Sequence, residues 1–333
     1  MKTVANVIED SVSEWGQRIT TFEITYPRII LAEINTHKIC VSNSSSSRAI
    51  PVAKLLELVR NQPFIPSQFG KNQPGMVSGE WETKEDMIYA NNAAERIWRE
   101  AKDSACRHAE DLMKIGVHKE LVNRIIEPYS YTSTILTATE WDNFFTLRTA
   151  SDAQPQFQEL AKLMQAAYIK SKPVKRNDHI PYRADIPDNA SWKDAFNYSA
   201  ARCGRVSYLN HGKDMTLAEG LEFADNRLLK PRHMSPFQHQ AFATEESKDK
   251  WSAQFRGWNM WRKVLEGDVV PYKPPTMEKR EDGALVFSYP EKELHSNSFV
   301  PQHKIEFNLE TEKWEAKKVD VRYKGTGIVG DPQ

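Results

Sequence analysis

Apolar residues near the N-terminus alternate with polar residues or form short runs, as they do in β-strands. Residues 3–9 and 18–34 are rich in Ile, Val, Thr, Phe and Tyr, with a polar turn between them around Ser13–Gly16. Branched and aromatic side chains are favoured in strands. We therefore expect two strands here, the second of them buried and extended from Tyr26 to Ile34.

Helical spacing dominates the middle of the chain. Apolar residues recur every three or four positions through residues 82–115, and Gly116 ends the run. The three prolines and three glycines of residues 61–80 indicate an ordered loop or lid. Shorter helices are predicted at residues 52–59, 118–126 and 153–170, with a segment of mixed pattern at 129–139.

The pattern changes again after residue 170. Residues 171–192 are rich in Lys, Pro and Asp, which is typical of a surface connection. Thr216 and Glu219 form a capping box that opens a helix to about Leu229. One more helix with a Trp-rich face is predicted at residues 251–265, and strands are predicted at residues 285–289, 305–309 and 316–323, the last two as a hairpin.

These elements predict an α+β fold. We expect the main domain to span residues 1–267. A β-rich extension of unknown role would follow over residues 268–333. No internal repeat of fixed period is present.

The amino-acid composition limits which binding partners and which cellular compartment we expect. Lys+Arg and Asp+Glu both number 45, so the zero net charge disfavours bulk nucleic acid or an anionic membrane surface as a partner. The three cysteines, Cys40, Cys106 and Cys203, are widely spaced and form no CxxC pair, which favours a reducing compartment and disfavours structural zinc. No signal-peptide pattern or membrane-length apolar run is present, so we expect a soluble, cytoplasmic protein.

Residues 36–48, Thr-His-Lys-Ile-Cys-Val-Ser-Asn-Ser-Ser-Ser-Ser-Arg, concentrate polar donors between two apolar segments. A strand that leads into such residues and then into a helix is a common way to bind a phosphate, because hydroxyls, backbone N–H groups and an arginine face the anion. The alternative is a Ser-rich linker, which this composition often marks. The apolar flanks favour the phosphate site.

Further candidate chemistry is scattered along the chain at Asn123-Arg124, Asn143 to Arg148, Gln154 and His233 to His239. For Arg124 and Arg148 the alternative to an anion-binding role is a surface ion pair. For His233 and His239 it is a histidine that is simply satisfied by its neighbours. HEXXH, GxSxG and P-loop motifs are absent. Gly325 to Gly330 matches the dinucleotide fingerprint, but that motif needs a strand before it and a helix after it, and only three residues follow here. We therefore expect a chance match.

Taken together, these clusters resemble the flavin-dependent thymidylate synthases, the ThyX family, and most of all its divergent bacteriophage type. The family signature is Arg-His-Arg, two residues, Ser, one residue, Asn-Glu, one residue, Ser, one residue, Arg. The matching positions of this sequence are His37, Asn43, Ser46 and Arg48. The positions that depart from the signature are Thr36, Lys38, Val41 and Ser44.

Other segments extend the resemblance from about residue 24 to residue 242. Asn143 to Arg148, followed by Ala153-Gln154, is similar to the family's FLxLR…AQ segment, and Arg124 precedes an apolar pair and a proline as in the family. Residues 205–208 are similar to its ARVSF segment, and residues 233–239 to HxTPFEH, with Gln238 in place of Glu. In ordinary members these last two segments come first, so the order here resembles a circular permutation.

The resemblance implies transfer of a one-carbon unit from 5,10-methylenetetrahydrofolate to C5 of dUMP. FAD, reduced by NADPH, would relay the carbon and supply the hydride. The catalytic positions that it implies are Arg148 and Ser46. The implied positions for the nucleotide are Arg48, Arg124, Arg148, Ser46, Ser47, Gln154 and Glu33, and those for the flavin are His37, Lys38, Asn43, Asn143, His233, Ser235 and Gln238.

The resemblance also implies a catalytic domain over residues 1–267 that has a central twisted sheet flanked by long helices. It further implies a homotetramer with shared active sites, located in the host cytoplasm if the source is viral. The altered signature leaves two alternatives open. One is a dUMP or dCMP 5-hydroxymethylase, in which water attacks the same one-carbon adduct. The other is an inactive homologue that binds flavin or nucleotide.

Overall fold

The computed structural model describes residues 2–208 and 211–267, together with the backbone of four strands within residues 276–318. The chain divides into two units, Met1–Met260 and Trp261–Gln333. The predicted domain boundary after residue 267 stays a prediction. All candidate site residues lie in the first unit.

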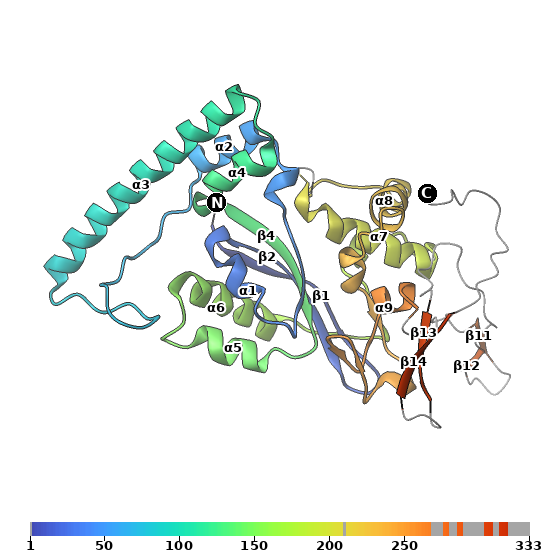
Figure 1. Ribbon diagram of the computed structural model, residues 1–333. Coiled ribbons are helices and arrows are strands. Elements are labelled where there is room, and N and C mark those ends of the chain that lie inside the picture. Colours follow the sequence, from blue (N-terminus) through green and yellow to red (C-terminus); the bar gives the residue numbers. More distant parts are fainter. Residues whose placement is uncertain are drawn as a thin grey trace. The chain divides into compact units, whose positions relative to one another are not determined.

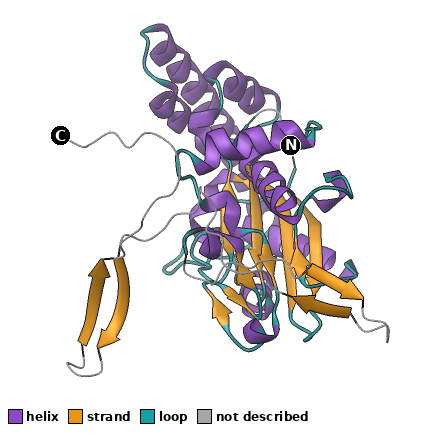
Figure 2. Cartoon of the chain, turned by 90° about the vertical axis from the view of Figure 1, so that its right-hand side faces the viewer, coloured by secondary structure: helices purple, strands orange, loops and turns teal. Residues whose placement is uncertain are grey.

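A five-stranded mixed sheet forms the centre of the first unit, in the order β3-β4-β2-β1-β5. Neighbouring strands are antiparallel except for β5, which runs parallel to β1. Figure 1 shows β1, β2 and β4 side by side, and Figure 2 shows the strands in orange with helices in purple around them. The strands are β1 (Val4–Val12), β2 (Arg18–Pro27), β3 (Val41–Ser44), β4 (Tyr131–Ala138) and β5 (Val174–Lys175).

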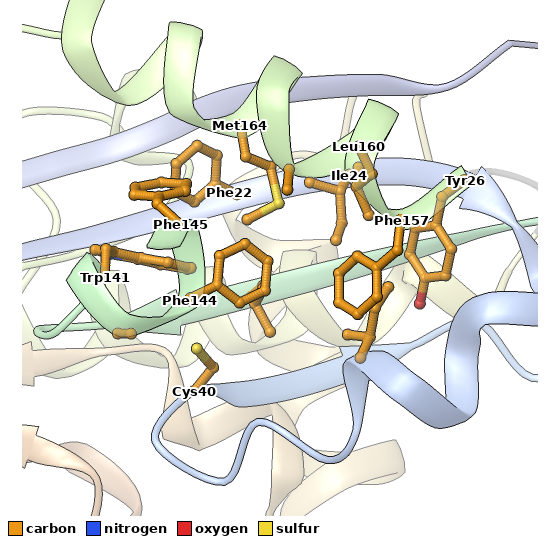
Figure 3. Close-up of a cluster of buried hydrophobic side chains, with 14 of the residues drawn as sticks. Phe22, Ile24, Tyr26, Cys40, Trp141, Phe144, Phe145, Phe157, Leu160 and Met164 are labelled. Atoms are coloured by element: carbon orange, nitrogen blue, oxygen red, sulfur yellow. The ribbon is translucent and has the colours of Figure 1, made fainter. Parts of the chain in front are cut away.

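Alternation along β2 buries one of its faces against two helices. Phe22, Ile24 and Tyr26 are fully buried and pack on α5 (Asp142–Thr149) and α6 (Pro155–Lys170). Figure 3 shows this cluster, with aromatic side chains from α5 and α6 meeting those of β2. Burial of several aromatic side chains makes this the main apolar contribution to stability on that face.

The prediction that β2 stays extended to Ile34 was wrong. The strand ends at Pro27, which has no N–H to continue the ladder. The chain then turns through η1 (Arg28–Ile30) and α1 (Leu31–Ile34). Ile30 and Ile34 are both buried because they lie one helical turn apart, so the apolar run was helical rather than extended.

Three helices pack beyond the end of the sheet: α2 (Val52–Asn61), α3 (Lys84–Lys114) and α4 (Lys119–Ile126). The first residue of α3 follows Thr83, whose side chain caps the helix by accepting from the N–H of Asp86. These helices confirm the predictions for this part of the chain. The loop between α2 and α3 is ordered by a bridge between Lys71 and Gly79.

A second layer covers the other face of the sheet, where Ile135 of β4 packs on Cys203 of α7 (Trp192–Gly204) and on Val206. A small sheet in the order β10-β7-β6 contributes to the same unit. The Thr216–Glu219 capping box is present as predicted. The elements are β6 (Asp178–His179), β7 (Ala241–Phe242), β10 (Asn259–Met260) and α8 (Leu217–Phe223), which continues as a π-helix over Ala224–Leu229.

Two predictions for the second half were wrong. Residues 171–192 are more than a surface connection, because they contain β6, and His179 and Ile180 are buried. Residues 251–260 form no helix but a short hairpin, β8 (Trp251–Ser252) with β9 (Phe255–Arg256), followed by β10. The positive φ angles of Ala253 and Gly257 turn the chain there, which a helix does not permit.

The second unit contains α9 (Trp261–Leu265) and two antiparallel strand pairs. The pairing of the last two strands confirms the predicted hairpin, although β14 begins earlier than expected. The Gly325–Gly330 motif lies outside the described residues. In the parts of the chain that the structure describes, no helix is long and apolar enough to cross a membrane. The strands are β11 (Thr276–Lys279), β12 (Leu285–Ser288), β13 (His303–Asn308) and β14 (Lys313–Lys318).

Candidate functional site

The donor-rich stretch at residues 36–48 is an ordered part of the sheet edge. A tight turn leads into β3, which pairs antiparallel with β4, and η2 (Ser47–Ala49) follows β3. The Ser-rich linker is therefore excluded. As an edge strand, β3 needs partners for its outer backbone groups from elsewhere in the chain.

Side chains from far downstream supply those partners. Nε2 of Gln238 donates to the carbonyl of Ser42 at 2.8 Å. The hydroxyl of Ser207 donates to the carbonyl of Ser44 at 3.4 Å and accepts from the N–H of Ser46 at 3.2 Å. The edge of β3 is thus completed by two segments more than 150 residues away, and only the family resemblance predicted that these segments belong together.

Asn43 connects the same two segments through its side chain. Its Nδ2 donates to the carbonyl of Cys203 at 2.8 Å, and its Oδ1 accepts from the hydroxyl of Ser235 at 3.4 Å. Ser235 and Gln238 lie on one short 3-10 helix, η7 (Ser235–Gln238). The structure therefore brings three predicted flavin positions together: Asn43, Ser235 and Gln238.

Arg148 and His37 also meet, although 111 residues separate them. Nε of Arg148 donates to Nε2 of His37 at 2.8 Å. The imidazole lies edge-on to Phe144 at 4.9 Å, and the guanidinium carbon lies 4.5 Å from the centre of the Phe157 ring. Burial and then the positive charge of Arg148 lower the pKa of His37. His37 is therefore neutral, with its proton on Nδ1 and its Nε2 holding the guanidinium.

Asn123 of α4 holds the turn that carries Ser46, Ser47 and Arg48. Its side chain is fully buried, and its Nδ2 donates to the carbonyls of Ser47 at 2.7 Å and Ile50 at 2.9 Å. Ser47 is buried, whereas Arg48 is exposed and can reach a ligand. The sequence placed Asn123 in a candidate cluster with Arg124 but indicated no specific role for its side chain.

Arg124 makes an ion pair instead of facing these residues. Its Nη1 lies 3.0 Å from Oε1 of Glu127, and that carboxylate also lies 3.2 Å from Nη2 of Arg28. The Arg124 side chain is 52% exposed. The surface ion pair that the sequence left open as an alternative is thus present, and any contact of Arg124 with a nucleotide stays a prediction.

Gln154 caps a helix. It precedes α6, and its Oε1 accepts from the N–H of Phe157 at 2.8 Å. This bond satisfies one of the N–H groups that a helix start leaves unpaired. Gln154 therefore has a structural role that accounts for its position, and its contact with substrate stays a prediction.

The remaining predicted flavin positions lie at the surface. The side chains of Lys38, Asn143 and His233 are exposed, and Nζ of Lys38 donates to the carbonyl of Asn35 at 2.8 Å. Exposed polar groups of this kind can meet a ligand without loss of an internal bond. The structure gives no hydrogen bond that joins any two of these three side chains.

Glu33 differs from the other substrate positions because it carries a buried carboxylate oxygen. Its Oε2 is inaccessible and has no hydrogen-bond partner among the described residues. Glu33 lies on α1, four residues before His37 in the sequence. A buried acceptor without a donor is costly, and a ligand N–H would satisfy it.

Burial makes the three cysteines poor nucleophiles, because it raises the pKa of each thiol. Cys40, Cys106 and Cys203 are buried and unpaired, and burial raises the pKa of Cys40 to about 12. A thiol with such a pKa carries almost no thiolate at neutral pH. Among the residues that the structure describes, no group of His, Cys, Asp or Glu side chains is placed to hold a metal ion.

A known protein family matches the part of the chain that contains β2, β3, β4, α5 and α6. Residues 10–174 match the Thy1 family, described as "Thymidylate synthase complementing protein". This range is similar to that family, and we refer to it as the Thy1 domain. It contains the His37–Arg148 pair, Asn43 and Arg48, whereas η7 lies beyond it. The match confirms the resemblance to the ThyX family over this range.

Two similar solved structures are complexes of the UMP/dUMP methylase PolB from Streptomyces cacaoi. The complex with 5-Br UMP is 15% identical, with a TM-score of 0.39, and the alignment covers 51% of this chain and 89% of PolB. The complex with 5-Br dUMP is 14% identical, with a TM-score of 0.38, and covers 51% and 90%. No curated protein matches the chain.

Proposed function

We propose that this protein transfers a one-carbon unit from 5,10-methylenetetrahydrofolate to C5 of dUMP, as a flavin-dependent thymidylate synthase. The observation that carries the proposal is the Arg148–His37 contact inside the Thy1 domain. It fixes a cation beside a neutral imidazole among aromatic side chains. A preorganised cation can stabilise the negative charge that develops on the oxygens of a pyrimidine when C5 becomes nucleophilic.

The nucleotide would use groups on both sides of β3. Arg148 would meet the base edge, and the buried oxygen of Glu33 would accept from a ring N–H. Arg48 and Ser46 would bind the phosphate, because Arg offers a forked donor and the turn offers hydroxyls. Ser47 would join them only after the turn moves, since its hydroxyl is buried. Arg124 and Gln154 would also contact the nucleotide. To do so, Arg124 would give up its ion pair with Glu127, and Gln154 would give up its cap on α6.

The residues present fit a flavin. Exposed Lys38 would provide a cation for the phosphates, and Asn43, Ser235 and Gln238 are joined by hydrogen bonds at one edge of the sheet. The remaining flavin positions would be His37, Asn143 and His233. When bound, FAD reduced by NADPH would supply the hydride and the one-carbon relay, and the protein would supply orientation. Lys38 is a point charge, so phosphate affinity would be lower than with the arginine of the family signature.

The order of the motifs is part of the proposal. The segments at residues 205–208 and 233–239 follow the Thy1 domain in sequence but complete the edge of β3 through Ser207, Ser235 and Gln238. We propose that they are the ARVSF-like and HxTPFEH-like segments in rotated order, consistent with a circular permutation of a phage-type member. A homotetramer with shared sites would supply further groups, including a partner's copy of Arg124.

Flavin binding and product analysis test the proposal. The purified protein should bind FAD with a flavin absorbance spectrum, and dUMP with the folate donor and NADPH should yield dTMP. Arg148→Ala should abolish turnover while the flavin stays bound. A hydroxymethyl nucleotide that forms without NADPH would instead support the 5-hydroxymethylase, which the departures at Thr36 and Ser44 leave open. A protein that binds neither FAD nor nucleotide would overturn the proposal.

A further inference from the structure

A continuous series of hydrogen bonds crosses the five-stranded sheet on the face opposite to the aromatic cluster of Phe22. It starts at Glu9, whose Oε1 accepts from Ser11 Oγ at 3.2 Å, and Ser11 Oγ lies 3.0 Å from Nδ1 of His179. Nε2 of His179 lies 2.7 Å from Oγ1 of Thr21. The chain then continues over residues 21, 137 and 239.

The inner half of the chain joins two strands to the segment after η7. Oγ1 of Thr21 lies 2.7 Å from Oγ1 of Thr137, which lies 2.9 Å from Nδ1 of His239. Nε2 of His239 is buried and has no partner among the described residues. Apart from Glu9, every residue in this series of hydrogen bonds is fully buried, and the Glu9 side chain is 11% exposed.

A β-bulge places the outer residues on this face. The register of β1 against β2 shifts between Val7, opposite Phe22, and Glu9, opposite Thr21. Strict alternation would turn Glu9 and Ser11 toward the aromatic face with Val7. The extra residue, Ile8, moves both to the histidine face, which is the re-aiming that bulges produce.

The carboxylate fixes the direction of all these bonds. Ser11 must donate to Glu9, so Ser11 accepts from Nδ1–H of His179. Nε2 of His179 is then an acceptor, which orders the hydroxyls of Thr21 and Thr137 toward it. His239 therefore donates through Nδ1–H, and its Nε2 carries a lone pair. Both imidazoles are neutral, and burial lowers the pKa of both.

We propose that this chain is a reversible proton path between His239 Nε2 and Glu9. A proton that binds Nε2 of His239 releases Nδ1–H to Thr137, each hydroxyl or imidazole passes its own proton outward, and the last O–H bond forms on Glu9. The reverse passage restores every bond. Atoms and charge balance, because one proton is gained at one end and one is held at the other.

Both ends suit this role. At the outer end, Glu9 lies 3.3 Å from Nη1 of Arg176 and 4.0 Å from Nε of Arg183, which also pairs with Asp178, and it can exchange its proton with water. At the inner end, His239 directly follows Gln238, which holds β3. The path rests on the proposed function only for the source of its proton, namely the hydrogen that C5 of the pyrimidine loses.

Hydrogen exchange of the two imidazole N–H groups tests the path without any substrate, because a ring proton that passes outward can exchange with water at Glu9 and a deuteron can return along the same bonds. In the wild-type protein, Nδ1–H of His239 should exchange with D₂O faster than the backbone amides of Thr21 and Thr137, which exchange only when the sheet opens. Thr21→Val should slow His239 by about tenfold or more, to the rate of those amides. His179 is the internal control, because its link to Glu9 through Ser11 stays intact and its exchange should stay fast.

Two matched variants separate the path from packing. Thr21→Ser keeps the hydroxyl and should keep the fast exchange. Thr25→Val is a control, because it removes a hydroxyl of the same strand that bonds to Ser133 and takes no part in the proposed path. Exchange of His239 at the amide rate in the wild type, or no change in Thr21→Val, would overturn the path. If Nδ1–H of His239 exchanges fast but the protein transfers no one-carbon unit, the path stands and the proposed function is wrong. If the protein transfers the one-carbon unit but Nδ1–H of His239 exchanges slowly, the proposed function stands and the path is wrong.

Discussion

Nε of Arg148 donates to Nε2 of His37 at 2.8 Å, so a neutral imidazole sets the direction of the cation in the candidate site. The pair joins α5 to the turn before β3 and is enclosed by Phe144 and Phe157. Arginine fits this place because its planar head donates to His37 through Nε and leaves its other nitrogens for a ligand.

Arg148→Lys keeps the charge but removes the Nε donor and the fork. We expect kcat/KM for one-carbon transfer to fall by about a hundredfold or more, which corresponds to about 2.7 kcal/mol of lost transition-state stabilisation. Flavin content should not change. Steady-state kinetics with a flavin spectrum would check both.

The matched control is Arg96→Lys, an exposed arginine paired with Glu100 on α3. It should leave kcat/KM unchanged. Equal losses in the two variants would contradict a specific role for Arg148.

His37 should titrate below its ordinary pKa of about 6.5, because burial and then Arg148 disfavour its charged form. A proton on Nε2 would break the bond from Arg148, so activity should fall on the acid side with a midpoint below that value. An NMR titration of His37 checks the pKa directly. Arg148→Ala should raise it, and a pKa that ignores this substitution would contradict the contact.

Asn123→Ala should lower the free energy of unfolding by about 2–4 kcal/mol, because it leaves the carbonyls of Ser47 and Ile50 without a buried donor. The turn carrying Arg48 should loosen, so the KM for the nucleotide should rise more than kcat falls. Urea unfolding and kinetics provide the two measurements. Asn226→Ala, which removes an exposed partner of Lys230, should change stability by less than about 0.5 kcal/mol.

Acid should destabilise the protein through its two buried histidines. The pKa of His239 is lowered to about 3 and that of His179 is also lowered, both by burial first, so the unfolded chain binds more protons at mildly acidic pH. Their contribution is fully present above about pH 6.5 and is lost as the pH falls toward the folded pKa. Denaturant unfolding between about pH 7 and pH 5 should show this slope.

His239→Asn tests the assignment, because the shorter amide retains a donor but does not titrate. The dependence of the unfolding free energy on pH should become shallower by up to one proton in that range. An unchanged slope would show that other groups govern acid stability.

The sequence predicted those elements whose local pattern agrees with their tertiary surroundings. The helix over residues 84–114 has caps and helical spacing, and the capping box at Thr216 is decisive on its own. The pattern failed where one apolar run suits two structures. Ile30 and Ile34 fit a buried strand or a helix equally well, and Pro27 was the signal for the change.

Some predicted site residues from distant segments meet in the fold, although their functional roles stay predictions. His37 with Arg148, and Asn43 with Ser235, meet across more than 100 residues, which no local pattern specifies. The sequence could not reveal that Gln154 caps a helix or that Arg124 pairs with Glu127, because both depend on the fold. The bulge at Ile8, which creates the histidine chain, has no sequence signature.

The most direct test of the central claim follows a labelled one-carbon unit from methylenetetrahydrofolate into the nucleotide, with FAD, NADPH and dUMP present. The account predicts label in the C5 substituent of the nucleotide with wild-type protein and none with Arg148→Ala, while both proteins retain the flavin. Label that stays on the folate with a flavin-loaded wild-type protein would contradict it.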